Sequence, residues 1–321
     1  MRPNKTRRAL GAAALALLAL GGCAAQAPAG ARHTGAIVAK STTTEFWLSV
    51  FAGAEAAATE YNLELTVAGP ETEEDWYSQN RMVAEAVEDG AEALVFSAID
   101  YESNAEAIDE AAARGVRIVA IDSPVNSDAV QTYIGTDNYA AGQMAAQAAL
   151  DGVEGQLTVG IVNYDVSSAN GQERERGAVD AFEQSGRARV AAVINTLAEA
   201  ARAQADTAAM LAEHPEINVL LAFNEPTSVG AADAVEGMGL AEEVFLVGFD
   251  SNVATIDGLQ DGTVDALIVQ NPYAMGYLGV ESAYRLLSGQ GGSPEATVDT
   301  STRIVNRDNM FTMDSQKALF A

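Results

Sequence analysis

Short apolar runs alternate with amphipathic segments from residue 35 to residue 269, and this alternation constrains the fold more strongly than any other feature of the sequence. We predict strands at 36–39, 63–67, 93–96, 116–121 and 132–134, then a second series at 157–162, 190–194, 219–223, 244–249 and 266–269. Continuous apolar strands separated by helices are typical of parallel sheets that are covered on both faces. The sequence therefore predicts an α/β protein with two doubly wound parallel-sheet lobes.

The amphipathic segments between the strands predict helices in both series. They are 46–61, 73–88 and 104–114 in the first series, and 139–150, 173–184, 197–213, 228–238 and 253–261 in the second. The chain has 321 residues, which exceeds the usual size of a single hydrophobic core and favours two domains.

The N-terminal residues have the layout of a bacterial secretory signal. A basic stretch within residues 2–8 precedes an apolar stretch at 9–20, and two glycines lead to Cys23. The apolar stretch has about 12 residues, whereas a membrane-spanning helix needs roughly 20. We therefore predict a signal peptide at 1–22 rather than a transmembrane helix.

Cys23 is the only cysteine in the sequence, and its position after Leu20, Gly21 and Gly22 resembles a lipobox, in which the thiol is acylated before cleavage. Two acyl chains give the stable membrane attachment that a single chain does not. We predict an exported protein that is lipid-anchored to the outer face of the cell membrane, or periplasmic, with 23–33 as a tether. The alternative is an ordinary signal peptide with a thiol near its end.

The charge balance excludes several classes of function. The sequence has 18 Lys and Arg against 45 Asp and Glu, a formal net charge of −27, which repels nucleic acid and anionic headgroups. With one cysteine and two scattered histidines, His33 and His214, the sequence has no zinc-binding spacing. We therefore predict no nucleic-acid partner and no metal.

Enzyme signatures are also missing from the sequence. There is no GxGxxG fingerprint, because Gly237-Met238-Gly239 lacks the third glycine, and there is no P-loop lysine and no GxSxG elbow. Carboxylates do gather at the predicted strand ends, which leaves glycoside hydrolysis as an alternative. We predict a binding protein that uses no cofactor and breaks no bond.

Polar residues follow the predicted strands at the point where each strand ends. Lys40 follows the first strand, Asp122 follows the fourth, and Asn224, Asp250 and Gln270 follow three strands of the second series. Ligands of doubly wound sheets bind at the carboxyl ends of the strands. We therefore expect these side chains to form a ligand site.

Phe46 and Trp47 open a predicted helix and permit two interpretations. They could be core residues, but adjacent helical positions face roughly 100° apart and cannot both point into one core stripe. At least one of them should therefore face the predicted ligand site. Aromatic planes cover the apolar faces of a sugar, while Asp, Asn, Arg and Gln exchange hydrogen bonds with its hydroxyl groups. The residues thus favour a small hydroxylated ligand, a sugar or polyol.

Seven short motifs then connect the chain to a known family over roughly residues 33–309. They are KSTTTEFW (40–47), IDS (121–123), GTDNYAAG (135–142), RERG (174–177), FN (223–224), VGFD (247–250) and VQNPYAMG (269–276). With these motifs the chain resembles the type I periplasmic sugar-binding family. The resemblance implies two lobes joined by three crossovers. The N-terminal lobe would contain 34–136 and 271–301, and the C-terminal lobe 137–270 and 302–321.

The resemblance also implies a function. It is the capture of a sugar or polyol between the lobes by a monomeric lipoprotein, which delivers the ligand to the permease of an ABC importer. The alternative is a sensory role, in which the protein presents its ligand, or an autoinducer-type signal, to a membrane receptor.

Binding residues carried over from the matching motifs come from both lobes. They are Lys40, Thr44, Phe46, Trp47, Asp122 and Ser123 in the first lobe, and Arg174, Glu199, Asn224, Asp250 and Gln270 in the second. The ribose-binding member of the family has a small hydroxyl residue at the position of Lys40, an arginine at that of Ser123 and an aromatic ring at that of Glu199. The resemblance therefore does not imply ribose itself.

Some of these polar residues have structural alternatives. Asp137 and Asn138 fit a helix cap better than a ligand contact, because both residue types accept from the free N–H groups at a helix start. Asp250 and Asn224 could also be caps, and Arg174 could be a solvated helix residue that pairs with a neighbouring acid.

Overall fold

The computed structural model describes residues 32–289 and 295–320. The predicted signal peptide, Cys23 and most of the predicted tether lie outside these residues. Within the part of the chain that is described, no helix is both long and apolar enough to span a membrane.

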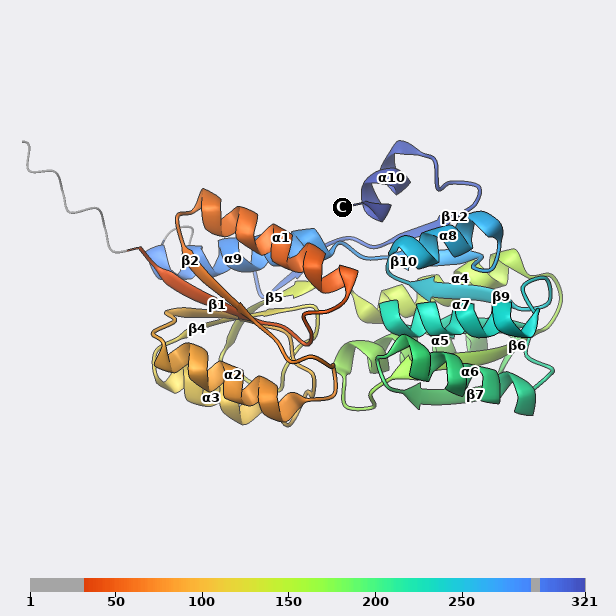
Figure 1. Cartoon of the computed structure of the whole chain (residues 1–321), viewed down its shortest axis with the longest axis horizontal. Coiled ribbons are helices and arrows are strands. Elements are labelled where there is room, and N and C mark those ends of the chain that lie inside the picture. The colour runs from red at the N-terminus through yellow and green to blue at the C-terminus, as the bar shows by residue number, and fades with distance from the viewer. Residues whose placement is uncertain (1–31, 290–294, 321) are drawn as a thin grey trace, which may run out of the picture. The chain divides into compact units, whose positions relative to one another are not determined.

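The first of two sheets contains six strands, all parallel (Figure 1). Its strands are β1 (Thr34–Val38), β2 (Glu64–Ala68), β3 (Ala93–Phe96), β4 (Arg117–Ile121), β5 (Val130–Gly135) and β11 (Thr297–Asp299), in the order β11-β5-β4-β3-β1-β2. Helices α1 (Glu45–Glu60) and α9 (Pro272–Ser288) cover one face, and α2 (Trp76–Glu88) and α3 (Ala105–Ala113) cover the other. Each face has its own core, since strand side chains alternate between the two clusters.

The second sheet also has six strands, five of them parallel. Its order is β12-β10-β9-β8-β6-β7, and only β12 (Arg303–Asn306) runs antiparallel, against β10 (Ala266–Val269). The other strands are β6 (Leu157–Tyr164), β7 (Ala188–Thr196), β8 (Val219–Ala222) and β9 (Phe245–Phe249). Helices α4 (Asn138–Gly152) and α5 (Ala169–Ser185) pack on one face, while α6 (Ala200–Glu213), α7 (Glu225–Met238), α8 (Val253–Asp261) and α10 (Met313–Leu319) pack on the other.

The chain passes between the sheets three times. It leaves the first sheet after β5, returns after β10 and crosses again between β11 and β12. The predicted α/β fold with two doubly wound lobes is therefore confirmed. The lobe limits at 136/137, 270/271 and 301/302 fall within these three connections and stay a prediction at the level of single residues.

Close helix packing supports the first lobe. A Cβ atom on Gly53 of α1 would lie 2.0 Å from the Tyr273 carbonyl oxygen, and one on Gly276 of α9 would lie 1.9 Å from the Val50 carbonyl oxygen. Only glycine permits these two helix backbones to approach so closely.

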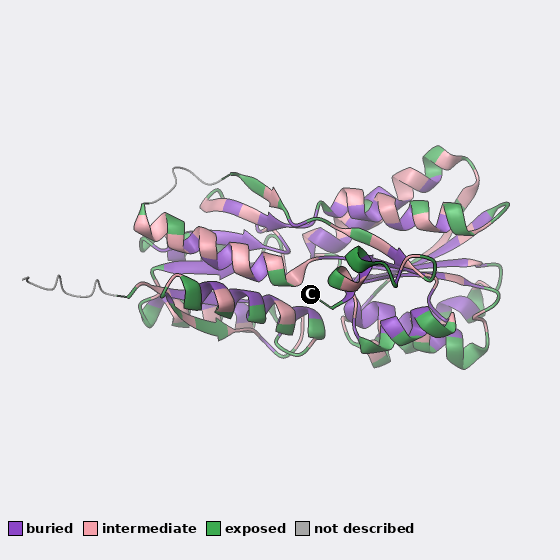
Figure 2. Cartoon of the chain, turned by 90° about the horizontal axis from the view of Figure 1, so that it is seen from above, coloured by how far each residue is buried: buried purple, intermediate pink, exposed green. Residues whose placement is uncertain are grey.

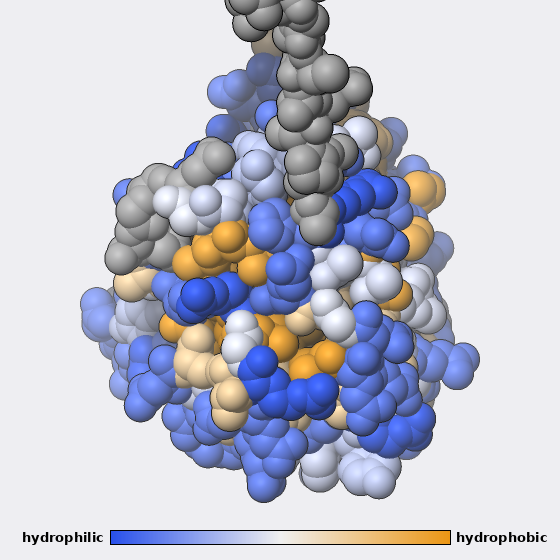
Figure 3. Space-filling model, turned by 90° about the vertical axis from the view of Figure 1, so that its left-hand side faces the viewer, coloured by the Kyte–Doolittle hydropathy of each residue, from blue (hydrophilic) through white to orange (hydrophobic). Residues whose placement is uncertain are grey.

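Buried residues concentrate in the strands and on the inward faces of the helices, as Figure 2 shows. The end of the first lobe that carries β1 and α9 presents mainly hydrophilic residues, with apolar side chains visible in the hollows between them (Figure 3). This surface agrees with the large excess of Asp and Glu in the sequence.

Candidate functional site

A cavity of about 290 Å³ lies where polar residues follow the strands of both sheets. It is lined by Lys40, Thr44, Phe46, Trp47, Glu73, Asp122, Tyr164, Asn170, Arg174, Asn224, Glu225, Pro226, Asp250 and Gln270. Nine of the predicted site residues are in this lining, and Ser123 and Glu199 are not. The sequence analysis did not predict the other lining residues, which are Glu73, Tyr164, Asn170, Glu225 and Pro226.

The strand ends position the polar side chains of this cavity. Lys40 comes just after β1, Asp122 directly after β4, and Asp250 and Gln270 directly after β9 and β10. Asp122 and Asp250 have positive φ angles of 56° and 67°, a left-handed conformation that Asp tolerates better than most residues. The backbone thus turns sharply at both carboxylates.

Arg174 of α5 is the central cation of the second lobe. Its side chain is buried, with Nε donating to Asn138 Oδ1 (2.9 Å), Nη1 to the Phe223 carbonyl oxygen (2.5 Å) and Nη2 to Gln270 Oε1 (2.8 Å). The guanidinium carbon also lies 4.6 Å from the centre of the Phe249 ring. The alternative of a solvated helix residue is therefore wrong for Arg174.

Asp250 lies beside this arginine network. Its Oδ1 accepts a hydrogen bond from Gln270 Nε2 (2.6 Å). Burial raises the pKa of Asp250 to about 7, although Arg174 and Gln270 oppose the rise. The helix that follows is capped by Asn252, so the alternative of Asp250 as its cap is wrong.

Asn224 combines a capping role with a place in the cavity wall. Its Oδ1 accepts from Thr227 N (3.0 Å) in a capping box at the start of α7. Its Nδ2 is buried and has no hydrogen-bond partner among the described residues. Buried donors are nearly always paired in native proteins, so this amide is available to a ligand. Asp137 is also a cap, because its side chain accepts from Ala140 N at the start of α4.

Phe46 and Trp47 are both core residues and cavity residues, so the two interpretations of this pair apply together. Both side chains line the cavity, and both also belong to the core cluster beneath α1. Their rings meet edge to face with centres 5.1 Å apart. Trp47 Nε1 donates to Glu73 Oε1 (2.9 Å), which fixes the indole, while Thr44 caps α1.

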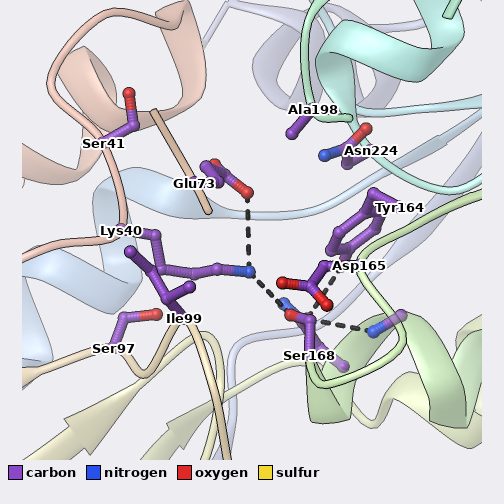
Figure 4. Close-up of polar contacts among 12 residues, drawn as sticks. Lys40, Ser41, Glu73, Ser97, Ile99, Tyr164, Asp165, Ser168, Ala198 and Asn224 are labelled. Carbon is purple, nitrogen blue, oxygen red and sulfur yellow. Dashed lines mark hydrogen bonds and ion pairs between the residues drawn. The ribbon is translucent and has the colours of Figure 1, made fainter. Parts of the chain in front are cut away.

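Lys40 reaches from the first lobe toward the second (Figure 4). Its Nζ donates to Ser168 Oγ (2.8 Å) and lies 3.5 Å from Glu73 Oε2. Burial alone would lower the pKa of Lys40, but the nearby Glu73 carboxylate, Tyr164 and Asp122 outweigh it and raise the pKa. The ammonium group therefore keeps its charge inside the protein.

Further polar contacts join the two lobes around the cavity. Glu225 of α7 accepts hydrogen bonds from Phe46 N (2.8 Å, to Oε2) and Glu45 N (3.2 Å, to Oε1) at the start of α1. Free N–H groups at a helix start favour a carboxylate. Burial nevertheless raises the pKa of Glu225. Asp122 accepts two hydrogen bonds, one from Ser97 Oγ of its own lobe (2.8 Å) and one from Asn170 Nδ2 of the other lobe (3.2 Å).

Ser123 and Glu199 lie away from the cavity. Ser123 is completely buried, and its Oγ has no partner among the described residues. Glu199 is exposed just before α6, where its side chain makes no capping hydrogen bond. The structure therefore gives neither residue a place at the cavity wall.

The charges at the cavity favour hydrogen bonding to neutral groups. Lys40 and Arg174 face four carboxyl groups, those of Glu73, Asp122, Glu225 and Asp250. This excess of acids disfavours a strongly anionic ligand. Among the described residues no cluster of His, Cys, Asp or Glu could hold a metal ion. The arrangement is suited to holding hydroxyl groups, with ionised partners that strengthen each hydrogen bond.

Two doubly wound lobes with a polar, aromatic-lined cavity at their strand ends define a class of ligand-binding proteins. Residues 35–291 match the family model described as "Periplasmic binding protein domain", so the chain belongs to this family. Family members are exported binding proteins of transport systems, which confirms the prediction of a binding protein rather than an enzyme.

Individual relatives cover nearly the whole chain. The D-ribose/D-allose-binding protein of Pseudomonas aeruginosa is 29% identical, over 91% of this chain and 96% of its own. A carbohydrate transporter solute-binding protein of Agrobacterium radiobacter, solved with D-arabinose, has a TM-score of 0.86 at 28% identity and covers 90% of this chain and 99% of its own. A solute-binding protein of Agrobacterium vitis, solved with D-fucose, has a TM-score of 0.85 at 28% identity, with 89% and 99% covered.

Proposed function

We propose that this protein is an exported solute-binding protein that captures a monosaccharide between its lobes and delivers it to an ABC importer. The single observation that carries the proposal is the cavity at the strand ends, whose lining combines three aromatic side chains with buried ionic and amide groups from both lobes. In this proposal the protein acts as a monomer, because one chain supplies both walls. The lobes comprise 34–136 with 271–301, and 137–270 with 302–321.

The ligand class is supported by the residues and by the relatives. Relatives and structural neighbours bind D-ribose or D-allose, D-arabinose and D-fucose. We assign ligand contact to Lys40, Thr44, Phe46, Trp47, Asp122, Arg174, Asn224, Asp250 and Gln270, all of which line the cavity. Asn224 Nδ2 offers a donor that has no partner among the described residues.

We further propose a lipid anchor at Cys23, which the lipobox-like sequence before it supports. Replacing this residue in the full-length protein, Cys23→Ala, should abolish incorporation of labelled fatty acid and move the protein from the membrane to the soluble fraction. Unchanged labelling would contradict the anchor.

Calorimetric titration with a panel of pentoses, hexoses and polyols tests the proposed function. We expect one or more sugars to bind, and Arg174→Ala and Asp250→Asn to weaken that binding by roughly tenfold to a hundredfold, since each removes a charged hydrogen-bonding group from a buried site. Arg176→Ala is the matched control on the same helix, because Arg176 is exposed, pairs with Glu173 and the Tyr139 ring, and is not in the cavity lining. Equal affinity in all four proteins, or no binding to any sugar or polyol, would refute the proposal.

A further inference from the structure

Tyr164 is a large side chain in the cavity wall that the proposed contacts do not use. It is the last residue of β6, its side chain is only 1% exposed, and it faces Lys40 across the space shown in Figure 4. Phe46 and Trp47 come from the first lobe, and Tyr164 is the aromatic residue of the lining that the second lobe supplies.

The Tyr164 ring is held in place from two sides. Its hydroxyl donates to Asn170 Oδ1 (2.8 Å), and Asn170 Nδ2 in turn donates to Asp122 Oδ1 (3.2 Å) of the first lobe. The Lys40 ammonium nitrogen lies 5.0 Å from the centre of the ring, within the range of a cation–π interaction. A rotation of the ring out of the cavity would break the buried hydrogen bond and separate these groups.

The protonation state of the ring is also fixed. Burial raises the pKa of Tyr164 to about 12, against the opposing effects of Arg174 and Lys40. The phenol therefore stays neutral and donates to Asn170 at neutral pH. Tyr164 acts on a ligand as a rigid wall of constant charge.

The cavity bounded by this wall is small. Its volume of about 290 Å³ includes space that is open to solvent, so the enclosed part is smaller than the roughly 300–1,000 Å³ that is typical of small-molecule sites. Tyr164 is one of the bulkiest buried side chains in the described chain, and it occupies the lining together with the extended Lys40. Tyr164 and Lys40 therefore limit the room that the lining leaves for a ligand.

We infer that Tyr164 determines specificity by limiting the size of the ligand, so that a pentopyranose is accepted in preference to the hexopyranose with the same ring hydroxyls. The inference rests on the proposed function, because it assumes a monosaccharide ligand. The two sugars of such a pair differ by one exocyclic hydroxymethyl group. A rigid wall excludes this group, whereas a cavity without the ring accommodates it.

Four matched pairs of sugars test this inference by calorimetry: D-ribose with D-allose, D-xylose with D-glucose, L-arabinose with D-galactose, and D-lyxose with D-mannose. In the pair that contains its tightest ligand, the wild-type protein should favour the pentose by about tenfold or more, the range expected for one carbon group at a fitted wall. Tyr164→Ala and Tyr164→Leu should reduce this ratio at least tenfold. Tyr164→Phe, which keeps the ring, should leave the ratio within about threefold of the wild-type value.

Other outcomes separate the two claims. A wild-type preference for the hexose, or an unchanged ratio in both smaller variants while sugar binding persists, would overturn the role of Tyr164 and leave the proposed function intact. Melting curves of the variants identify any that fail to fold, and Tyr164→Leu provides the test if Tyr164→Ala does. If neither these eight sugars nor any other sugar of the wider panel binds the wild-type protein, monosaccharide capture fails, and the size limit fails with it.

Discussion

Asp250 shows how one residue can serve both the fold and a ligand. It lies at the end of β9 with a left-handed backbone, accepts a hydrogen bond from Gln270 and has the Arg174 cation nearby. Burial disfavours its ionised form, while the arginine favours it. Because burial prevails, the carboxyl group titrates near neutral pH, where it can change between donor and acceptor.

This balance makes the stability of the ligand-free protein depend on pH. The pKa of Asp250 is about 7 in the folded protein against an ordinary 3.8, so the folded state binds the proton more tightly than the unfolded state does. The stability that comes from Asp250 is complete below pH 4 and is lost as the pH rises through 7, by an amount on the order of 4 kcal/mol. Among the neighbouring groups, Arg174 and Gln270 lower the pKa of Asp250, whereas Glu225 and Asp122 raise it.

Urea unfolding of the wild-type protein and Asp250→Asn at pH 5 and pH 8 measures this effect. We expect the wild-type protein to lose stability relative to the variant between these values, because the amide cannot titrate. A stability difference that is the same at both pH values would show that Arg174 holds Asp250 ionised throughout.

Cavity residues that directly follow a strand can be predicted from the sequence more readily than residues that contact the other lobe. Lys40, Asp122 and Gln270 were found because polar side chains after apolar strands mark a sheet edge. Tyr164 ends β6 and carried the same signal, but an aromatic residue there also fits a core. Glu225 acts on the start of α1, 179 residues away in sequence, and no local pattern encodes such a contact.

Helices and strands with a clear local sequence pattern were predicted, and those without one were not. The apolar runs predicted the ten strands from β1 to β10, and the predicted helices match α1 to α8 apart from shifts at their ends, such as 173–184 against Ala169–Ser185 for α5. The prediction omitted β11 and β12, because short edge strands such as Thr297–Asp299 have no continuous apolar run. It also omitted α9 and α10, which follow the last apolar strand of the alternating pattern.

A substitution that adds one methyl group between α1 and α9 tests how closely these helices pack. Gly276→Ala should lower the free energy of unfolding by about 2 kcal/mol, because the new Cβ would meet a backbone oxygen that cannot move alone. Gly237→Ala in α7 is the control, since its Cβ would have no neighbour within 4 Å, and there alanine should stabilise the helix by about 0.5–1 kcal/mol. If urea unfolding shows both variants to be at least as stable as the wild-type protein, the helices do not pack this closely.

At the scale of the whole molecule, both lobes supply residues to the cavity, and hydrogen bonds join the lobes beside it. Asn170 and Ser168 of the second lobe bond to Asp122 and Lys40 of the first, and Glu225 bonds to the start of α1. A ligand that contacts both walls adds to these bonds only when the lobes are together, so it binds the closed state more tightly. The account therefore requires that binding shifts the protein toward closure.

The distance between the lobes in solution, with and without ligand, measures this requirement most directly. Cys23 is the only native cysteine, so a soluble form that begins at residue 33 allows spin labels to be placed at Glu55→Cys in α1 and Glu236→Cys in α7, both exposed positions. Pulsed dipolar spectroscopy should show a broad distribution that includes longer distances without ligand, and a narrow, shorter one when the sugar found by titration saturates the site. An identical distribution in both states, with binding confirmed in the same sample, would contradict capture by closure of the two lobes.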